Sequence, residues 1–403
     1  MESANRLSPA DRRLHATLLV RRGRPEDRRQ AMDILENLVQ IPQQAQARDR
    51  VQLASLYEAE NRIQPAFEQF TTVARDEQAS PIHLAAYVEF LQRNATEQPQ
   101  FVSRAEIILE RLEADPVSAQ SAFRLRIRKL KQVEEAAAKT SGIRTAIDAF
   151  VTRQIAAKAD AQEKRDSFTG LLVLLVREEL GDEAVRVARE TTVIPKPSAA
   201  ACLANGLTLV RDSSKVVEAA EPIFRDAQQE APADAELLFA LGNLRYVNGR
   251  RDEAVALYRK VLESNPDHKL AINNLALSLA EDPSGLDEAL KVITSAIAKL
   301  GRDSGLIDTH AVVLLRQKNP VEARKLLEEA VQSQDSEPMY FLHLAAAFHA
   351  EGNVDRARRV FQRAVALDAA AAAITPGDRA MFRELEQLFT VPASADMPDK
   401  PQT

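Results

Sequence analysis

The stretch AELLFALGNLRYVNGRRDEAVALYRKVLESNPD, residues 235–267, decides the fold of this chain. Its first half places Leu238, Leu241, Gly242 and Arg245 at positions i, i+3, i+4 and i+7, which is the spacing of one helix face. Asn248-Gly249 then interrupts the pattern, because glycine readily accepts the positive φ that ends a helix. The first half therefore predicts a helix that ends in a tight turn.

The second half of the same stretch predicts another helix. Asp252 and Glu253 stand in its first turn, where the positive end of the helix dipole favours acidic residues. Asn265-Pro266 ends it, because the residue before proline avoids helical geometry. Its apolar stripe is Ala254, Val255, Tyr258, Val261 and Leu262. We expect a helical hairpin with Gly242 and Ala254 at the close approach of its two axes.

The pattern of the second helix recurs along most of the chain. An alanine is followed by a large residue four positions later and by a small or β-branched residue three further on. From residue 220 onward the alanines are 34, 35, 34 and 34 residues apart, and upstream the intervals are 35, 39, 41, 38 and 36 residues. The alanines are Ala31, Ala66, Ala105, Ala146, Ala184, Ala220, Ala254, Ala289, Ala323 and Ala357. Such a period is typical of stacked repeats, because one hairpin cannot bury its apolar face alone.

This unit resembles the tetratricopeptide repeat, on Leu241-Gly242, Ala254, Tyr258 and Pro266. Further matches stand at Ala220, Phe224, Ala227 and Pro232, at Leu275-Ala276, at Leu344-Ala345 with Phe348, Gly352, Ala357 and Phe361, and at Leu53-Ala54, Tyr57, Ala66 and Phe70. Tryptophan is never present, and Tyr87, Glu134 and Leu172 replace the small residue in three repeats. The resemblance implies an all-α, right-handed α-solenoid superhelix of about ten helix-turn-helix repeats with a C-terminal capping helix.

Four segments are expected. Divergent helical repeats would occupy residues 1–164, and repeats nearer the consensus 165–368. Residues 369–390 would form the capping helix, since Thr375-Pro376-Gly377-Asp378 has the features of a helix start. Residues 391–403, with three prolines, would be a disordered tail.

Composition argues against several function classes. The net charge of −6 disfavours nucleic-acid binding, because that affinity comes from clustered cations on phosphates. The single cysteine, Cys202, excludes an internal disulfide, and we expect it to be a buried, unreactive thiol. No apolar run approaches the length of a membrane span, and no signal peptide precedes the first repeat, so we expect a cytoplasmic protein without membrane insertion.

Motifs for catalysis, cofactor binding or metal binding are missing from the sequence. It contains no glycine-rich nucleotide fingerprint, phosphate-binding loop, nucleophile elbow or HExxH motif. His343 and His349 are six residues apart and do not share a helix face. The basic run RLRIRKLK, residues 124–131, is interpreted as a solvated helix face, with contact to an acidic partner segment as the alternative. We therefore expect no catalytic residue, cofactor or metal site.

The resemblance also implies where a partner would bind. In the tetratricopeptide family the first helices of successive repeats line a concave surface, and their inward-facing residues contact the ligand. Carried over to this sequence, those residues are Asn205, Leu209, Phe239, Asn243, Tyr246, Asn273, Asn274, Leu277, Asp308, Val312, His343 and His349. Asparagine can donate to and accept from a peptide backbone, and aromatic rings offer contact area at low entropic cost.

The function that follows is a non-catalytic scaffold that binds a peptide or helix of a protein partner in the concave groove. The repeat style resembles bacterial scaffold proteins. Two alternatives remain open: an accessory region of a larger enzyme or regulator whose catalytic part lies elsewhere, and a self-associating assembly subunit. Self-association would use the N-terminal repeats around Leu130 and Phe150.

Overall fold

The computed structural model describes residues 8–210, 213–333, 337–372 and 375–390, and all regular structure in these ranges is helical. The chain divides into two compact units, unit 1 up to Ala157 and unit 2 from Lys158 onward. The all-α fold class and its construction from helical repeats are thereby confirmed. The expected tail, residues 391–403, lies outside the described residues.

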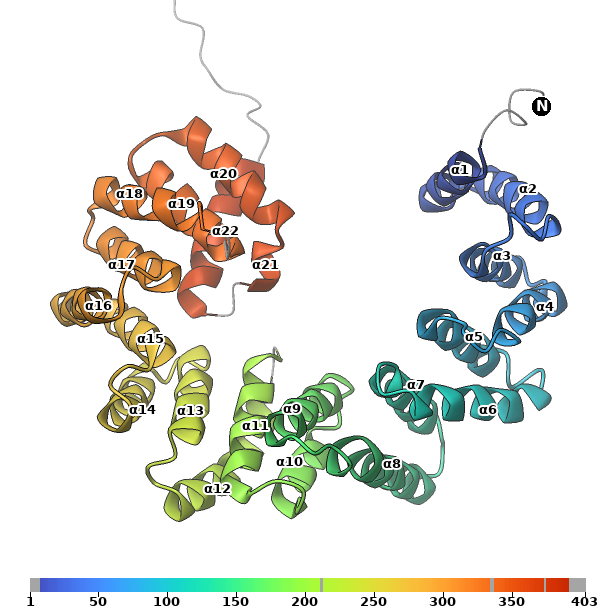
Figure 1. The fold of residues 1–403 in the computed structure, drawn as a ribbon, viewed down its shortest axis with the longest axis horizontal. Coiled ribbons are helices and arrows are strands. Elements are labelled where there is room, and N and C mark those ends of the chain that lie inside the picture. Colours follow the sequence, from blue (N-terminus) through green and yellow to red (C-terminus); the bar gives the residue numbers. More distant parts are fainter. Residues whose placement is uncertain (1–7, 211–212, 334–336, 373–374, 391–403) are drawn as a thin grey trace, which may run out of the picture. The chain divides into compact units, whose positions relative to one another are not determined.

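Unit 1 consists of four helical hairpins in sequence order (Figure 1). Its helices are α1 (Pro9–Arg22), α2 (Pro25–Gln40), α3 (Ala47–Ala59), α4 (Ile63–Ala74), α5 (Pro81–Arg93), α6 (Gln100–Ala114), α7 (Ala119–Lys131) and α8 (Ala136–Phe150), which a π-helical segment, η2 (Val151–Ala156), extends. Each hairpin packs on the next, and its second helix contacts the first helix of its neighbour.

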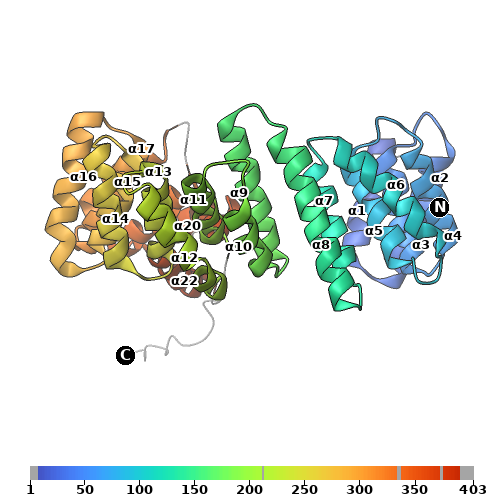
Figure 2. The same ribbon diagram turned by 90° about the horizontal axis from the view of Figure 1, so that it is seen from below.

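Unit 2 continues with six hairpins and two further helices. Its elements are α9 (Ala161–Arg177), α10 (Gly181–Glu190), α11 (Lys196–Thr208), α12 (Ser214–Glu230), α13 (Ala235–Val247), α14 (Arg251–Ser264), α15 (Lys269–Ala280), η3 (Pro283–Gly285), α16 (Leu286–Leu300), α17 (Ser304–Arg316), α18 (Pro320–Ala330), α19 (Pro338–Ala350), α20 (Val354–Ala366), α21 (Ala369–Ala372) and α22 (Pro376–Thr390). Figure 2 shows α13 to α17 standing side by side. The segment expected to form one capping helix thus contains two, α21 and α22.

The repeating alanines explain why the hairpins close. Every one of the ten lies on the second helix of its hairpin and is buried. Nine have at most 1% of their surface exposed, whereas Ala146 has 9%. A methyl group at this position lets the first helix approach closely, and the large residue four positions later fills the space beside it.

Five hairpins share one turn geometry. An N–H just after the turn donates to a carbonyl five residues earlier, for example from Arg250 to Arg245 at 2.9 Å and from Asn319 to Leu314 at 2.9 Å. The residue before this donor has positive φ in each case, and it is Asn61, Glu179, Gly249, Lys318 or Gly352. This bond pattern satisfies helix-terminal carbonyls in the Schellman motif. The backbone geometry of the turn is therefore kept even where the sequence does not supply glycine.

The close approach predicted at Gly242 is present in α13. A Cβ at Gly242 would lie 2.6 Å from Cε1 of Tyr258, the aromatic residue of α14. Tyr258 is completely buried, so its ring cannot swing away from an added side chain. Glycine is required here by packing and not by backbone conformation.

Unit 1 solves the same packing problem with aromatic residues. Tyr87 of α5, which stands at the position of the small residue, is 1% exposed and stacks on Phe70 of α4 with a centroid distance of 5.3 Å. Phe90 and Phe101 extend the cluster into α6, with centroids 5.7 Å apart. Glu134, by contrast, lies in the loop before α8 and is not part of a helix crossing.

Candidate functional site

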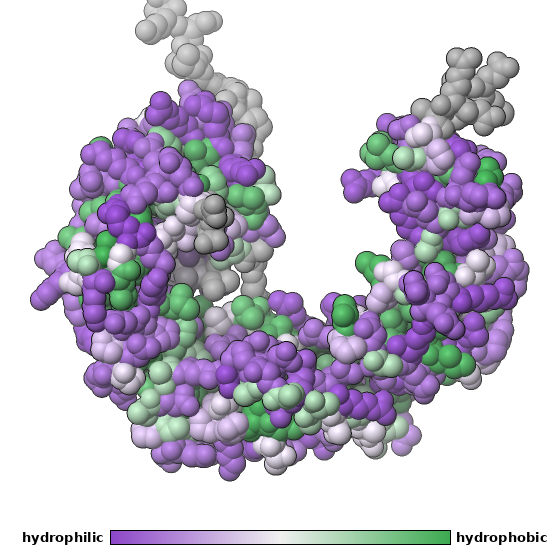
Figure 3. Space-filling model, in the orientation of Figure 1, coloured by the Kyte–Doolittle hydropathy of each residue, from purple (hydrophilic) through white to green (hydrophobic). Residues whose placement is uncertain are grey.

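The first helices of the hairpins in unit 2 pack on one another in the order α11, α13, α15, α17 and α19, and we call this series the first-helix row. All predicted groove residues lie on it, except that Leu209 directly follows α11. Their exposure differs. Asn205, Phe239, Asn243, Asn273, Asn274, Leu277 and His349 are half-buried, Tyr246, Asp308, Val312 and His343 are buried, and Leu209 is exposed. The visible surface carries its apolar residues in small groups among hydrophilic ones (Figure 3).

Two asparagines join neighbouring repeats in the middle of the row. Asn274 of α15 donates from Nδ2 to Oδ1 of Asn243 of α13 at 2.8 Å, and the Tyr258 hydroxyl donates to the same oxygen at 2.9 Å. Burial raises the pKa of Tyr258, so its hydroxyl remains a donor. Asn243 Nδ2 and Asn274 Oδ1 have no partner among the described residues. One amide donor and one amide acceptor therefore remain for a ligand.

Asn273 of α15 carries a buried acceptor. Its Oδ1 is shielded from solvent and receives no hydrogen bond within the described chain. Its amide nitrogen lies toward the start of α17, 3.4 Å from the place that a Cβ of Gly305 would take. Leaving such an oxygen unpaired costs about 1–3 kcal/mol, so a donor from outside the chain would be favourable here.

Tyr246 belongs to the interior of the row. It is 5% exposed, and its hydroxyl donates to Oε1 of Glu281, directly after α15, at 2.8 Å. Burial and the Glu281 carboxylate raise the pKa of Tyr246. Val312 of α17 is likewise buried, with 1% exposure. Both side chains hold first helices together.

His343 of α19 lies between two carboxylates. Its Nδ1 is 2.8 Å from Oδ1 of Asp308 of α17, and its Nε2 is 3.3 Å from Oδ1 of Asp378 of α22. Burial by itself lowers the pKa of His343, but the two carboxylates outweigh it and raise this pKa to about 10. His343 is therefore protonated at neutral pH and donates from both nitrogens. With both nitrogens engaged, the imidazole has no position left at which to act as a base.

Arg316 of α17 and Asp378 of α22 lie beside His343, and neither was predicted as a site residue. Burial by itself raises the pKa of Asp378. The hydrogen bond and positive charge of His343 outweigh burial and lower this pKa, with help from Thr375 and Arg316. The Thr375 hydroxyl accepts the N–H of Asp378 at 3.1 Å and so caps α22. The helix-start pattern at residues 375–378 signalled the cap in the sequence, but nothing in the sequence placed it against His343.

The body of α22 also lies on α19 (Figure 1). The His349 ring meets Phe389 edge to face with centroids 6.3 Å apart, and Phe361 of α20 contacts both Phe382 and Phe389. Leu385 is 2% exposed. Three predicted groove residues are thus occupied within the chain. Asp308 contacts His343, and both His343 and His349 contact α22.

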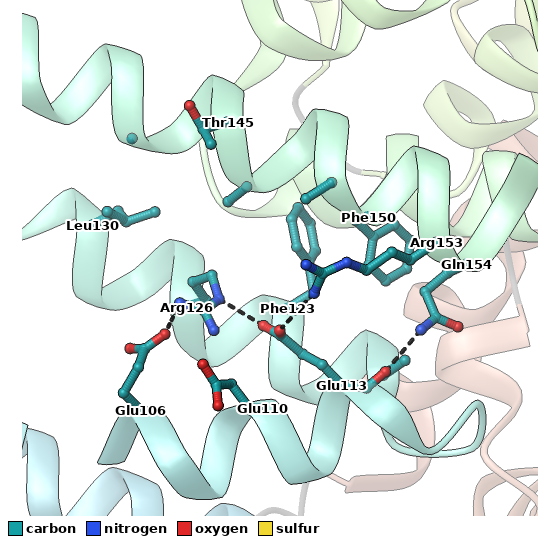
Figure 4. A pocket seen from close by; sticks show the side chains of 14 residues that line it. Glu106, Glu110, Glu113, Phe123, Arg126, Leu130, Thr145, Phe150, Arg153 and Gln154 are labelled. Atoms are coloured by element: carbon teal, nitrogen blue, oxygen red, sulfur yellow. Dashed lines mark hydrogen bonds and ion pairs between the residues drawn. The ribbon is translucent and has the colours of Figure 1, made fainter. Parts of the chain in front are cut away.

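A second candidate site is a pocket of about 420 Å³ in unit 1, between α6, α7, α8 and η2 (Figure 4). Its apolar wall includes Phe123 and Phe150, whose ring centroids are 4.6 Å apart. Leu130 and Gly142 also line it. The residues proposed for self-association therefore face this pocket.

Ion pairs line the other side of the pocket. Arg126 pairs with Glu113 at 2.6 Å and with Glu106, and Lys129 lies 3.5 Å from Glu106. Glu110 points toward Arg126 (Figure 4). Since Arg126 is only 22% exposed, part of the basic run at residues 124–131 holds α7 against α6 and is not a solvated surface.

Other residues singled out in the sequence have structural positions. Cys202 is buried, and burial raises the pKa of its thiol to about 11. No cluster of three or more histidine, cysteine, aspartate or glutamate side chains able to hold a metal ion occurs within the described ranges. Among the helices that the structure describes, none combines the length and apolarity needed to cross a bilayer.

Solved structures similar to this chain include several tetratricopeptide repeat proteins, all at low sequence identity. One from Parabacteroides merdae is 15% identical over 66% of this chain and 98% of that one, with a TM-score of 0.44. A thermophilic tetratricopeptide protein of Thermus thermophilus is 19% identical over 46% of this chain and 97% of that one, with a TM-score of 0.38. YrrB, described as having an unusual peptide-binding site, is 15% identical over 51% of this chain and 97% of that one, with a TM-score of 0.31. No curated protein sequence matches this chain.

Family profiles make the assignment. Two profiles, both described as tetratricopeptide repeat, match residues 215–279 and 309–373. The first match spans α12 to α15, including the Gly242–Tyr258 crossing, and the second begins within α17 and includes α18 to α21. Residues 215–279 and 309–373 of this chain are therefore tetratricopeptide repeats, and the other described hairpins have the same helix-turn-helix form.

Proposed function

We propose that this protein is a non-catalytic interaction scaffold, and that the α11–α15 part of its first-helix row binds an extended segment of a protein partner. Tetratricopeptide repeats generally serve as protein-interaction scaffolds, which supports the class of function. The choice of α11–α15 rests on the side-chain amide groups there that have no partner within the described chain.

Asn273 carries this proposal. Its buried Oδ1 has no donor within the described chain, and a backbone N–H of an extended segment would supply one once the half-buried side chain turns outward on binding. Asn243 Nδ2 and Asn274 Oδ1, on the neighbouring repeats, offer the complementary donor and acceptor. An extended peptide presents N–H and C=O groups in alternation, which suits such a series of side-chain amides.

Phe239 provides an apolar anchor beside these amides. Its ring is half-buried and packs on the His268 ring with a centroid distance of 4.9 Å. A ring already held on one face offers contact area to a partner without losing much conformational entropy. Leu209 adds exposed apolar surface at the α11 end of the row, with 53% of its surface accessible.

The test begins by selecting peptides from a random phage-displayed library on the full-length protein. The tightest peptide is synthesised and titrated against wild type, Asn243→Arg and Asn273→Arg by fluorescence anisotropy. We expect each substitution to weaken binding at least tenfold, about 1.4 kcal/mol, because it removes the amide and fills its space with a charged chain.

Gln229→Arg is the matched control, since it makes the same change from amide to cation on the exposed side of α12. It should leave the affinity unchanged. Equal binding by all four proteins would refute the α11–α15 site, provided that thermal melting shows each variant folded.

A further inference from the structure

The last helix of the chain departs from the regular stacking of the repeats. After α20, the four-residue α21 packs on both α19 and α20, where the next first helix would begin. The chain then turns, and α22 lies against α19 with its first turn directed at earlier repeats. In addition to closing the end of the stack, α22 therefore covers part of the first-helix row.

The first turn of α22 reaches three repeats. Asp378 contacts His343 of α19. A Cβ at Gly377 would lie 2.7 Å from Nη2 of Arg316, at the end of α17, and 3.7 Å from Oε1 of Glu281, directly after α15. The chain passes so close to Arg316 that only a residue without a side chain fits without moving the guanidinium.

The chemistry of this contact is that of ligand recognition. The cations His343 and Arg316 face the Asp378 carboxylate, which also belongs to the first turn of a helix, where a negative charge is favourable. Asp308 holds His343 from its other side, and Glu281 lies beside Arg316 and accepts from Tyr246. On the receptor side, His343 and Glu281 are thus each hydrogen-bonded to a residue outside α22.

A series of apolar contacts follows one face of α22. Phe382, Leu385 and Phe389 stand four, seven and eleven positions after Asp378 and pack on α19 and α20. On the opposite face Arg383 and Glu384 are exposed. The occupant is therefore a helix with an aspartate in its first turn and a single apolar stripe.

We propose that the α17–α19 part of the first-helix row is a receptor for a helix of this type, and that α22 fills it as an internal ligand until a partner helix displaces it. The partner helix would carry an aspartate in its first turn and apolar residues four, seven and eleven positions later. This inference rests on the proposed function, because displacement of α22 would extend the α11–α15 binding surface along the same row.

An internal ligand weakens binding of a partner by mass action. A segment joined by a short connection acts at an effective concentration on the order of millimolar. A helix in solution with the same contacts would therefore bind poorly to the wild-type chain. Releasing α22 while keeping the receptor intact should reveal the binding.

The experiment uses the full-length chain and a fluorescent synthetic peptide with the sequence of residues 375–390. A release variant carries Asp378→Lys and Phe382→Asp, which remove the contacts of α22. Its control carries Arg383→Asp and Glu384→Lys, which likewise introduce one aspartate and one lysine, but on the exposed face of the same helix. We expect the release variant to bind the peptide at least tenfold more tightly than the wild type or the control.

Changes in the peptide test recognition without affecting the fold of the protein. An Asp378→Asn peptide should bind the release variant at least tenfold more weakly, while a Glu384→Gln peptide should bind equally well. Equal affinity for wild type and release variant, or no binding to a release variant that circular dichroism shows to be folded, overturns the proposal.

A further readout separates this inference from the function on which it rests. Hydrogen exchange in the release variant should become faster in α22 while α17 and α19 keep their protection. If the α22 peptide fails to bind but Asn243→Arg and Asn273→Arg still weaken binding of the selected peptide at least tenfold, α22 is a structural cap only and the α11–α15 site stands.

Discussion

The α13–α14 and α7–α8 hairpins differ in how their two helices meet. In α13–α14, Gly242 lies under the ring of Tyr258, and the crossing is filled. In α7–α8, Phe123 and Phe150 meet at one end, and a pocket of about 420 Å³ remains between these helices and their neighbours. Two hairpins with the same topology can thus have either a filled or an open interface.

The position of the anchoring alanine accounts for the difference. Ala254 is in the first turn of α14, so the helices approach directly after the hairpin turn. Ala146 lies in the later part of α8, because this helix extends further toward its N-terminus. The close approach is then displaced from the turn, and the pocket lies beside Ala146, where ion pairs and rings only partly fill the space. The repeat consensus therefore specifies that the two helices of a hairpin meet closely, and also where along the helices they meet.

The largest expected effect tests the filled crossing. Gly242→Leu should lower the free energy of unfolding of unit 2 by about 3 kcal/mol, because the buried Tyr258 ring cannot move aside. Urea denaturation followed by circular dichroism measures the change. Gly142→Leu is the same substitution in α8, where the nearest atom is the flexible end of Leu130 and the pocket adjoins.

We expect Gly142→Leu to change stability by less than about 1 kcal/mol, since gained helix propensity offsets the shift of Leu130. Equal losses for the two variants would show that the two interfaces are equally closed, contrary to the structure.

An intermediate effect tests what holds the open hairpin together. Arg126→Ala removes the cation shared by Glu106 and Glu113 and leaves two carboxylates close together. We expect a loss of about 1–2 kcal/mol in unit 1, reduced at high salt because the pair is partly solvated. Thermal melting at low and high salt checks both statements.

Lys139→Ala, on the N-terminal part of α8, is its control and should stay within about 0.5 kcal/mol of wild type. A loss at Arg126 no greater than this would mean that the aromatic contacts alone hold α7 in place.

The smallest effect tests the turn with positive φ, which α13–α14 shares with α17–α18 and α19–α20 but not with α7–α8. Lys318→Gly in the α17–α18 turn should raise stability by up to about 1 kcal/mol, because glycine adopts this conformation without steric strain. Gly352→Lys in the next hairpin is the reverse change and should lose a similar amount, since no atom lies within 4 Å of the place of its Cβ. Paired melting curves of the two variants decide, and effects of the same sign would contradict the strain argument.

The sequence predicted the candidate site unevenly. It identified Asn243, Asn273 and Asn274 as side chains on first helices, because a helical period fixes which residues share a face. It also named Asp308 and His343, but as groove residues and without their contact to each other or to Asp378. Arg316 carried no pattern that distinguished it from other surface arginines. The unit 1 pocket was not predicted, since residues 124–131 have the pattern of an ordinary basic helix.

The sequence by itself determined the hairpins, their turns and their repetition, because these depend on interactions between residues fewer than about 40 positions apart that recur with each repeat. The tertiary structure decided which of the exposed positions remain available. The contacts of Asp378 and its neighbours in α22 decide whether this helix extends the stack or covers the first-helix row. Their partners lie in three different hairpins. Such contacts follow from how the hairpins stack and not from any local pattern, so a periodic sequence contains no signal for them.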